Sequence, residues 1–161
     1  AHNYELFLDS HVNMGNYAEP MSVSCIVFNF GYLPGGNHKL ATRPESSILA
    51  LTTSLSLLKK GGILMLCIYS GGDSGFQERD ALLEWLKELD PKKYLVIKTE
   101  YYNLPNKPPM PVIVVKLSAA SGHAYFLSFY MQTPLRQMIH VFLCLRGILS
   151  FVILKLCFIS Q

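Results

Sequence analysis

The sequence predicts an α/β fold with the arrangement expected of the second half of a doubly wound domain. Short runs of β-favouring residues alternate with longer segments in which apolar residues recur at helical spacing. The runs are apolar almost throughout, which is typical of strands buried on both faces of a parallel sheet. Half of the 161 residues are apolar and 16% are charged, a composition that excludes intrinsic disorder.

The first predicted elements lie on either side of a loop rich in glycine and proline. Residues 24–30 (SCIVFNF) are predicted to form a buried strand, and Tyr4–Leu8 a short strand upstream of it. The loop GYLPGGNHKLATRP follows, and the capping-box spacing of Thr42 and Glu45 predicts the start of a helix. The apolar stripe of this helix comprises Ile48, Leu51, Leu55 and Leu58. A central strand at residues 24–30 needs neighbours, which we expect to lie upstream.

The second half of the pattern repeats this alternation. The first helix is predicted to end at residues 59–61 (KKG), and Ile63–Tyr69 is predicted to form the second buried strand. Ser74 and Gln77 again have capping-box spacing, and the second helix is predicted to stop at residues 90–91 (DP). The apolar face of this helix comprises Ala81, Leu82, Trp85, Leu86 and Leu89.

The predicted domain ends near residue 117, where the composition changes. Its last strands, Tyr94–Tyr102 and Val112–Leu117, are separated by the proline-rich NLPNKPPMP, which gives the order β-α-β-α-β-β. Residues 1–117 carry equal numbers of basic and acidic side chains, so the formal net charge of +3 belongs entirely to residues 118–161. In this tail, Met138–Ser160 is mostly apolar and long enough to span a bilayer as a helix, although basic residues interrupt it. A membrane anchor and a tail unrelated to the domain are both left open.

The loop after the strand at residues 24–30 is the first candidate for chemistry. Ligands in doubly wound folds bind outside the carboxyl ends of the strands. There, Asn29 offers an amide donor and a carbonyl acceptor, Gly31 permits a close backbone approach and Tyr32 offers a face for stacking. An ordinary turn is the alternative, because GYLPGG consists of turn-forming residues. Neither G-x-G-x-x-G nor G-x-x-x-x-G-K-[ST] occurs, so this is not a nucleotide phosphate loop.

The second candidate is the triplet Asp9, Ser10 and His11, which follows the short first strand. An acid, a hydroxyl and an imidazole at a strand end can hydrogen-bond a purine edge or assist proton transfer. The alternative is a helix N-cap with a satisfied histidine. The four cysteines are far apart in sequence and no histidine stands at metal-ligand spacing, which indicates a reducing compartment and no metal site.

Together these motifs resemble a known family. Six segments are involved: LDSH, FNFGYLPGG, the T-x-P before a helix, LLKKGGILMLCIYSGG, the E-x-x-x-x-x-x-W-L-K-E-L-D helix and N-x-P-x-x-P-P. They closely resemble the YtqB/MnmM-like family of class I methyltransferases, and the resemblance covers roughly residues 5–117. The resemblance implies a Rossmann-like fold, S-adenosyl-L-methionine as cofactor and RNA as substrate, in the cytoplasm or an organelle. One bacterial member methylates the 5-aminomethyl group of a 2-thiouridine at the tRNA wobble position. The oligomeric state, including a homodimer, stays open.

The resemblance also implies roles for single residues. Asn29 and Tyr32 would be catalytic, and the residues beside the cofactor would be Asp9, Ser10, His11 and Asn29. The residues that bind the substrate would be Gly31, Tyr32, Leu33, Pro34, Gly35, Lys39 and Arg43.

The sequence departs from the family in two respects. The D-x-[TA]-x-G-N-G-x-D-T loop with which family members begin does not occur, and residues 118–161 have no counterpart. We therefore expect residues 1–117 to be a partial methyltransferase domain, its back half, and residues 118–161 to be a hydrophobic tail. Besides an RNA methyltransferase, two alternatives stay open: a non-catalytic truncated product, and a membrane-associated interaction protein that uses residues 138–160.

Overall fold

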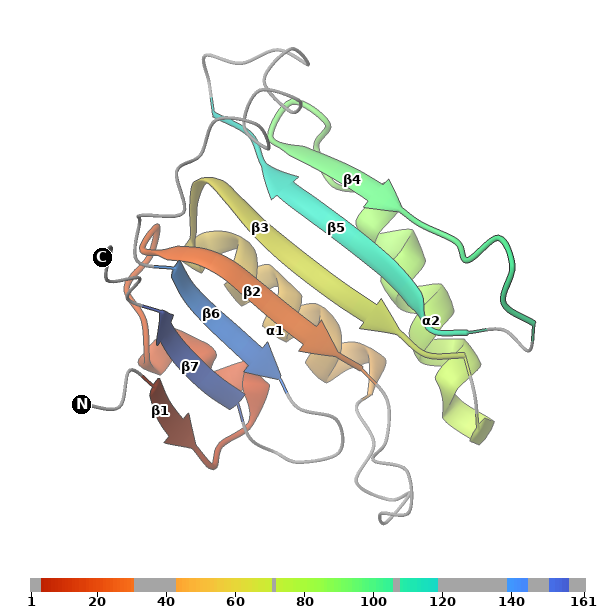
Figure 1. Ribbon diagram of the computed structural model, residues 1–161, viewed down its shortest axis with the longest axis horizontal. Helices are drawn as coiled ribbons and strands as arrows, with labels where there is room; N and C mark the ends of the chain where they lie inside the picture. Colours follow the sequence, from red (N-terminus) through yellow and green to blue (C-terminus); the bar gives the residue numbers. More distant parts are fainter. Residues whose placement is uncertain are drawn as a thin grey trace.

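A seven-stranded sheet with helices is the main feature of the computed structural model (Figure 1). The model describes residues 4–30, 43–70, 72–105, 108–118, 139–144 and 151–156. The elements are β1 (Tyr4–Phe7), the 3-10 helix η1 (His11–Asn16), β2 (Val23–Asn29), α1 (Pro44–Leu57), β3 (Leu58–Ile68), α2 (Gly72–Lys87), β4 (Tyr94–Lys98), β5 (Met110–Lys116), β6 (Ile139–Cys144) and β7 (Phe151–Leu156). The order of the strands in the sheet is β1-β7-β6-β2-β3-β5-β4.

The centre of the sheet is parallel, as the nearly continuous apolar runs predict. Cys25 of β2 is in register with Ile63 of β3 on one side and with Val141 of β6 on the other, and both pairings are parallel. The outer pairs of strands are antiparallel. They are β3 with β5, β4 with β5, β6 with β7 and β1 with β7. Because β6 lies downstream of β2 in the sequence, the expectation that both neighbours of this strand lie upstream is wrong.

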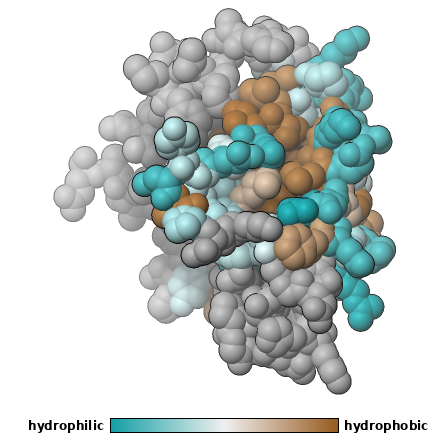
Figure 2. Space-filling model, turned by 90° about the vertical axis from the view of Figure 1, so that its right-hand side faces the viewer, coloured by the Kyte–Doolittle hydropathy of each residue, from teal (hydrophilic) through white to brown (hydrophobic). Residues whose placement is uncertain are grey.

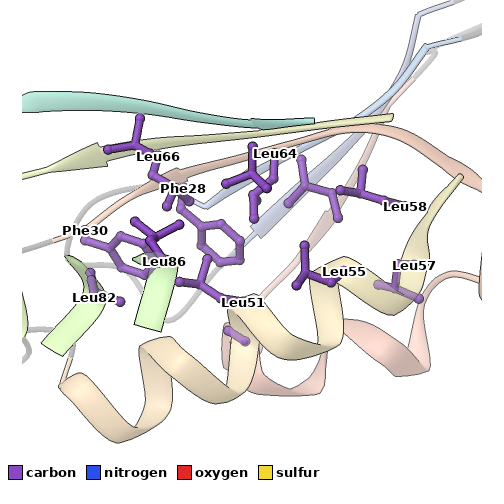
Figure 3. Packing of buried hydrophobic residues seen from close by; sticks show 14 of the residues in the cluster. Phe28, Phe30, Leu51, Leu55, Leu57, Leu58, Leu64, Leu66, Leu82 and Leu86 are labelled. Carbon is purple, nitrogen blue, oxygen red and sulfur yellow. The ribbon is translucent and has the colours of Figure 1, made fainter. Parts of the chain in front are cut away.

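The described helices lie on one face of the sheet, where they enclose a single apolar core (Figure 1). Alternation along the strands turns Phe28, Leu64 and Val114 toward the helices, and each of these side chains is 0% exposed. Figure 3 shows Phe28 and Leu64 of the sheet facing Leu51 of α1. Met14 extends the same core to η1. The core thereby fixes the positions at which β2 ends and α1 begins.

The ends of α1 differ from the predicted ends. The N-cap is Arg43, whose carbonyl oxygen accepts a hydrogen bond of 3.0 Å from the hydroxyl of Ser46. The predicted N-cap, Thr42, lies outside the described residues. The helix stops at Leu57 because its successor already pairs with β2, so the predicted end at residues 59–61 is wrong. Gly61 has a positive φ of 77°, as a left-handed stop requires, but it lies inside β3.

The later elements also have shifted ends. α2 begins two residues before Ser74, which therefore lies inside the helix instead of capping it. The helix ends at Lys87, before the predicted stop at residues 90–91. β4 ends at Lys98, so the predicted strand Tyr94–Tyr102 is too long. The pairing of β4 with β5 also ends at Lys98, which lies opposite Val112.

Lys116 stabilises the C-terminal end of α1 from β5. Its ammonium group donates hydrogen bonds to the carbonyl oxygens of Leu55 (2.6 Å) and Leu58 (2.8 Å). Carbonyl groups in the last turn of a helix lack intrahelical partners, and the negative end of the helix dipole attracts a cation. This contact holds α1 against the sheet.

The described parts of the predicted tail are strands. β6 and β7 both lie within Met138–Ser160, where a bilayer-spanning helix was one of the alternatives. They pair antiparallel, with His140 opposite Lys155. None of the described helices has the length and hydropathy that crossing a membrane requires.

Candidate functional site

The candidate site lies at the carboxyl end of β2, where η1, β2 and the start of α1 meet. Asn29 is in register with Cys67 of β3, and the backbone N–H of Phe30 donates to the Cys67 carbonyl oxygen at 3.1 Å. The ring of His11 stands edge-on to Phe28, with ring centroids 6.2 Å apart and planes at 87°. His11 therefore packs against Phe28 of β2, although the two residues are 17 positions apart in the sequence. The loop that follows Phe30 lies outside the described residues.

His11 supplies a buried polar atom without a partner. The residue is 6% exposed, and its Nε2 has no hydrogen-bond partner among the described residues. Burial lowers the pKa of His11, and a hydrogen bond to the backbone of Ser46 in α1 opposes this effect. The imidazole is therefore neutral at pH 7, and Nε2 can make one further hydrogen bond.

Asn29 supplies a second such atom. Its Oδ1 is buried and accepts no hydrogen bond from the described part of the chain. Alternation along β2 directs this side chain to the sheet face opposite Phe28. The polar atoms of His11 and Asn29 therefore lie on opposite faces near the same end of the strand. Leaving a buried acceptor unpaired costs about 1–3 kcal/mol, so a polar ligand that supplies a donor would bind favourably here.

Asp9 has little remaining capacity for a ligand. Its Oδ1 accepts hydrogen bonds from the backbone N–H of Ser10 (2.7 Å) and from Nδ2 of Asn13 (2.8 Å), and its Oδ2 accepts one from the hydroxyl of Tyr17 (2.7 Å). Ser10 is the N-cap of η1 and accepts from the N–H of Val12 at 3.4 Å. The helix-cap alternative thus describes the local structure of this triplet, except that Nε2 of His11 has no hydrogen-bond partner among the described residues.

We expect Tyr17→Phe to raise the pKa of Asp9 toward its ordinary value of 3.8. The hydrogen bond from Tyr17 is the largest cause of the lowered pKa, and Asn13 adds to it. The folded-state pKa lies below the unfolded one, so the stabilisation by Asp9 is present above about pH 3.8 and lost as the pH falls through the folded value. A carbon-13 NMR titration of the Asp9 carboxyl measures the shift. The control, Tyr101→Phe, should leave it unchanged, and an unaltered Asp9 pKa in Tyr17→Phe would contradict the assignment.

Sequence reasoning gave no role to Glu78, which the structure buries beside the site. The hydroxyl of Ser47 in the first turns of α1 donates to Oε1 of Glu78 in α2 at 2.6 Å, and the two residues are 0% and 4% exposed. A signal was present, because Glu78 precedes Ala81 and Leu82 by three and four residues and so shares their apolar helix face. A buried carboxylate requires hydrogen bonds, and this one joins the two helices that follow β2 and β3.

The other predicted site residues divide into two groups. Arg43 is exposed at the start of α1. The remaining predicted substrate residues lie outside the described residues; they are Gly31, Tyr32, Leu33, Pro34, Gly35 and Lys39. Where side chains are described, no group of histidine, cysteine, aspartate and glutamate residues could hold a metal ion. Cys25 and Cys67 are free thiols, and burial raises the pKa of Cys25 to about 11.

The sequence is similar to proteins of one family. A family model described as "Putative rRNA methylase" matches residues 1–115. A curated protein of Arabidopsis thaliana, the chloroplastic "tRNA (mnm(5)s(2)U34)-methyltransferase", is 32% identical over 111 residues. The match covers 68% of this chain and 39% of the relative.

Solved structures with the same fold include three bacterial proteins. One described as a "putative rRNA-methylase" from Clostridium thermocellum is 45% identical, with a TM-score of 0.64. A "putative methyltransferase" from Streptococcus mutans in complex with SAH is 34% identical, with a TM-score of 0.61, and an rRNA methylase from Streptococcus thermophilus is 28% identical, with a TM-score of 0.56. The match to the C. thermocellum protein covers 68% of this chain and 58% of that protein. For the S. mutans protein the two shares are 68% and 59%, and for the S. thermophilus protein they are 70% and 57%. The predicted Rossmann-like α/β fold is thereby confirmed.

Proposed function

Because this chain belongs to the rRNA methylase family, whose model matches residues 1–115, we propose that it forms part of an RNA methyltransferase that uses S-adenosyl-L-methionine. The observation that carries this proposal is that two buried polar atoms near the carboxyl end of β2, His11 Nε2 and Asn29 Oδ1, have no hydrogen-bond partner among the described residues. The description of the S. mutans relative in complex with SAH supports the cofactor. The description of the A. thaliana relative supports a tRNA wobble uridine as substrate, and a location in the cytoplasm or an organelle.

The described residues fit an adenosyl group. His11 is neutral and has one free ring nitrogen, which suits a purine edge, and Ser10 beside it fixes the turn. Asp9 acts as a positioning residue, because three hydrogen bonds already hold its carboxylate. When bound, S-adenosyl-L-methionine supplies an activated methyl group on a sulfonium sulfur.

In this proposal, Asn29 binds and orients the substrate amine. Its Oδ1 would accept one N–H of a neutral amine and so orient the nitrogen lone pair. A protonated amine has no lone pair, so the neutral form is the one that reacts. Catalysis then comes mainly from proximity and orientation. In the same proposal, Tyr32 stacks on the base, residues 31–35 shape the pocket, and Lys39 and Arg43 contact phosphates.

The proposal is tested by adding S-adenosyl-L-methionine to the 161-residue chain and following the His11 imidazole by NMR. We expect a saturable shift of the His11 signals, and binding about tenfold weaker in His11→Leu, which lacks the hydrogen bond. Glu88→Gln, an exposed site at the end of α2, is the matched control. A folded chain whose His11 signals do not respond at millimolar cofactor would favour the non-catalytic alternative.

A further inference from the structure

The segment that follows β4 carries exposed aromatic side chains. Tyr101 is 48% exposed, Tyr102 is fully exposed and Leu104 is 50% exposed. We call residues 101–104 the tyrosine loop. Single apolar residues on a surface are ordinary, whereas two adjacent aromatic rings and a leucine within four residues form a patch. Leaving these rings in water forgoes the free energy that their burial would provide, so the tyrosine loop is a candidate for contact with a ligand.

The pairing of the strands places the tyrosine loop in line with Asn29. Asn29 is in register with Cys67 of β3, and Cys67 is in register with Pro111 of β5. The carbonyl oxygen of Pro111 accepts hydrogen bonds from the backbone N–H and from the hydroxyl of Thr99, both at 3.0 Å. These four residues therefore form one row across β2, β3, β5 and the end of β4. Since neighbouring strands lie about 4.8 Å apart, Thr99 is about 14 Å from Asn29 along this row.

The tyrosine loop also lies at the end of the sheet that holds the candidate site. β4 is antiparallel to β5, and β5 is antiparallel to β3, so β4 runs in the same direction as β3 and β2. The three strands point toward one end of the sheet, and the tyrosine loop, in green after β4, lies beyond that end (Figure 1). The carboxyl ends of the strands are where α/β sheets bind their ligands. A ligand at Asn29 that extends along the row would therefore reach the tyrosine loop.

The chemistry of the tyrosine loop favours nucleobases over phosphates. Residues 98–104 contain one base and one acid, Lys98 and Glu100, which form an ion pair at 3.1 Å. The faces of tyrosine rings suit stacking with unpaired bases, which tolerates any base because every base has a π-face. Pro105 restricts the backbone at the end of the loop, which lowers the entropy lost on binding. On the side of β4 and α2, apolar and hydrophilic residues lie next to each other (Figure 2), and nucleic-acid interfaces are more polar than protein interfaces.

We propose that the tyrosine loop stacks on an unpaired base of the RNA substrate, next to the nucleotide whose amine lies at Asn29. This inference rests on the proposed function, from which it takes the RNA and the place of the amine. Because the row from Asn29 to Thr99 is about 14 Å long, Tyr101 and Tyr102 hold a neighbouring nucleotide and not the one that reacts. The tyrosine loop thereby selects RNA in which the target lies in a single-stranded segment, such as the loop of a hairpin.

The test uses, as a probe, an RNA hairpin whose single-stranded loop carries one 2-aminopurine, a base whose fluorescence falls when it stacks. The probe is titrated with the 161-residue chain in the absence of cofactor, and we expect saturable quenching. Tyr102→Ala should raise the Kd about tenfold, because it removes one stacking partner. Tyr102→Phe keeps the ring and should change the Kd less than about twofold. The matched control is Tyr4→Ala on β1, at the opposite edge of the sheet, where the tyrosine is 47% exposed; its Kd should also stay within about twofold.

A second measurement separates stacking from contacts with phosphates. Added salt should weaken the binding of every variant, but the ratio of the Tyr102→Ala Kd to the native Kd should stay the same, because stacking releases no counterions. A ratio that falls to one at high salt overturns the inference.

Other outcomes distinguish this inference from the proposed function. RNA binding that Tyr102→Ala leaves unchanged, or binding without quenching, overturns the inference and leaves the proposed function standing. A folded chain that binds no RNA also overturns it, and a His11 shift with S-adenosyl-L-methionine would then still support the cofactor. Self-association without RNA that Tyr102→Ala abolishes overturns it too, because a second copy of the chain would then occupy the tyrosine loop.

Discussion

Replacing Phe28 with alanine is expected to lower the free energy of unfolding by about 3–5 kcal/mol, the range for a fully buried phenylalanine. Phe28 is 0% exposed and stacks on Phe30, with centroids 5.0 Å apart and planes at 5°. Its ring also meets the edge of His11. Truncation would leave a cavity between β2 and α1, under the candidate site, that these rigid rings could fill only in part. Urea denaturation followed by circular dichroism measures the loss.

Met65→Ala is the control for this prediction, because Met65 lies on the opposite face of the same sheet and is 43% exposed. We expect it to cost about 1 kcal/mol or less. If Phe28→Ala lowered the free energy of unfolding by less than about 1 kcal/mol, the stability of the core would not depend on the Phe28 ring. Since Phe28 contacts His11, the variant should also move the His11 imidazole signals, whereas Met65→Ala should not.

The sequence was a good guide wherever a structure depends on local composition. The run at residues 24–30 is apolar almost throughout, and it became a central strand with parallel neighbours on both sides. This prediction depends on the rule that strands buried on both faces of a parallel sheet are apolar almost throughout.

Contacts between segments that are far apart in the chain could not be predicted from local sequence patterns. Tyr17 follows Asp9 by eight residues in no regular pattern, so its hydrogen bond to the carboxylate could not be read from the sequence. The pairing of β6 with β2 joins residues more than a hundred positions apart, and its strand had been considered as part of a bilayer helix. A highly apolar segment is compatible with either structure, because hydropathy alone does not distinguish a strand from a helix.

The second face of the sheet marks a further limit of sequence patterns. Apolar residues on both sides of β2 and β3 predict two buried faces. All the described helices lie on the face that holds Phe28. The pattern does not say what lies against the face that holds Asn29.

Asn29→Ala is expected to reduce methyl transfer to RNA at least about 100-fold while changing the Kd for S-adenosyl-L-methionine less than about threefold. The substitution removes the amide that would orient the amine, and loss of orientation alone reduces rates by about two orders of magnitude. Because its Oδ1 accepts no hydrogen bond within the described part of the protein, truncation breaks no described contact of that atom. Transfer of a labelled methyl group to RNA measures the effect.

Cys67→Ser is the matched control, since Cys67 is paired with Asn29 across the same two strands and has no proposed chemical role. It should retain most of the activity, and Asn29→Gln, which keeps the amide but displaces it, should fall between alanine and the native residue. The same substitutions in a relative that carries the motif test whether this role of the asparagine is shared. If Asn29→Ala turns over normally there and here, Asn29 does not orient the amine. If only the Kd for the cofactor rises, its Oδ1 serves the cofactor instead of the substrate.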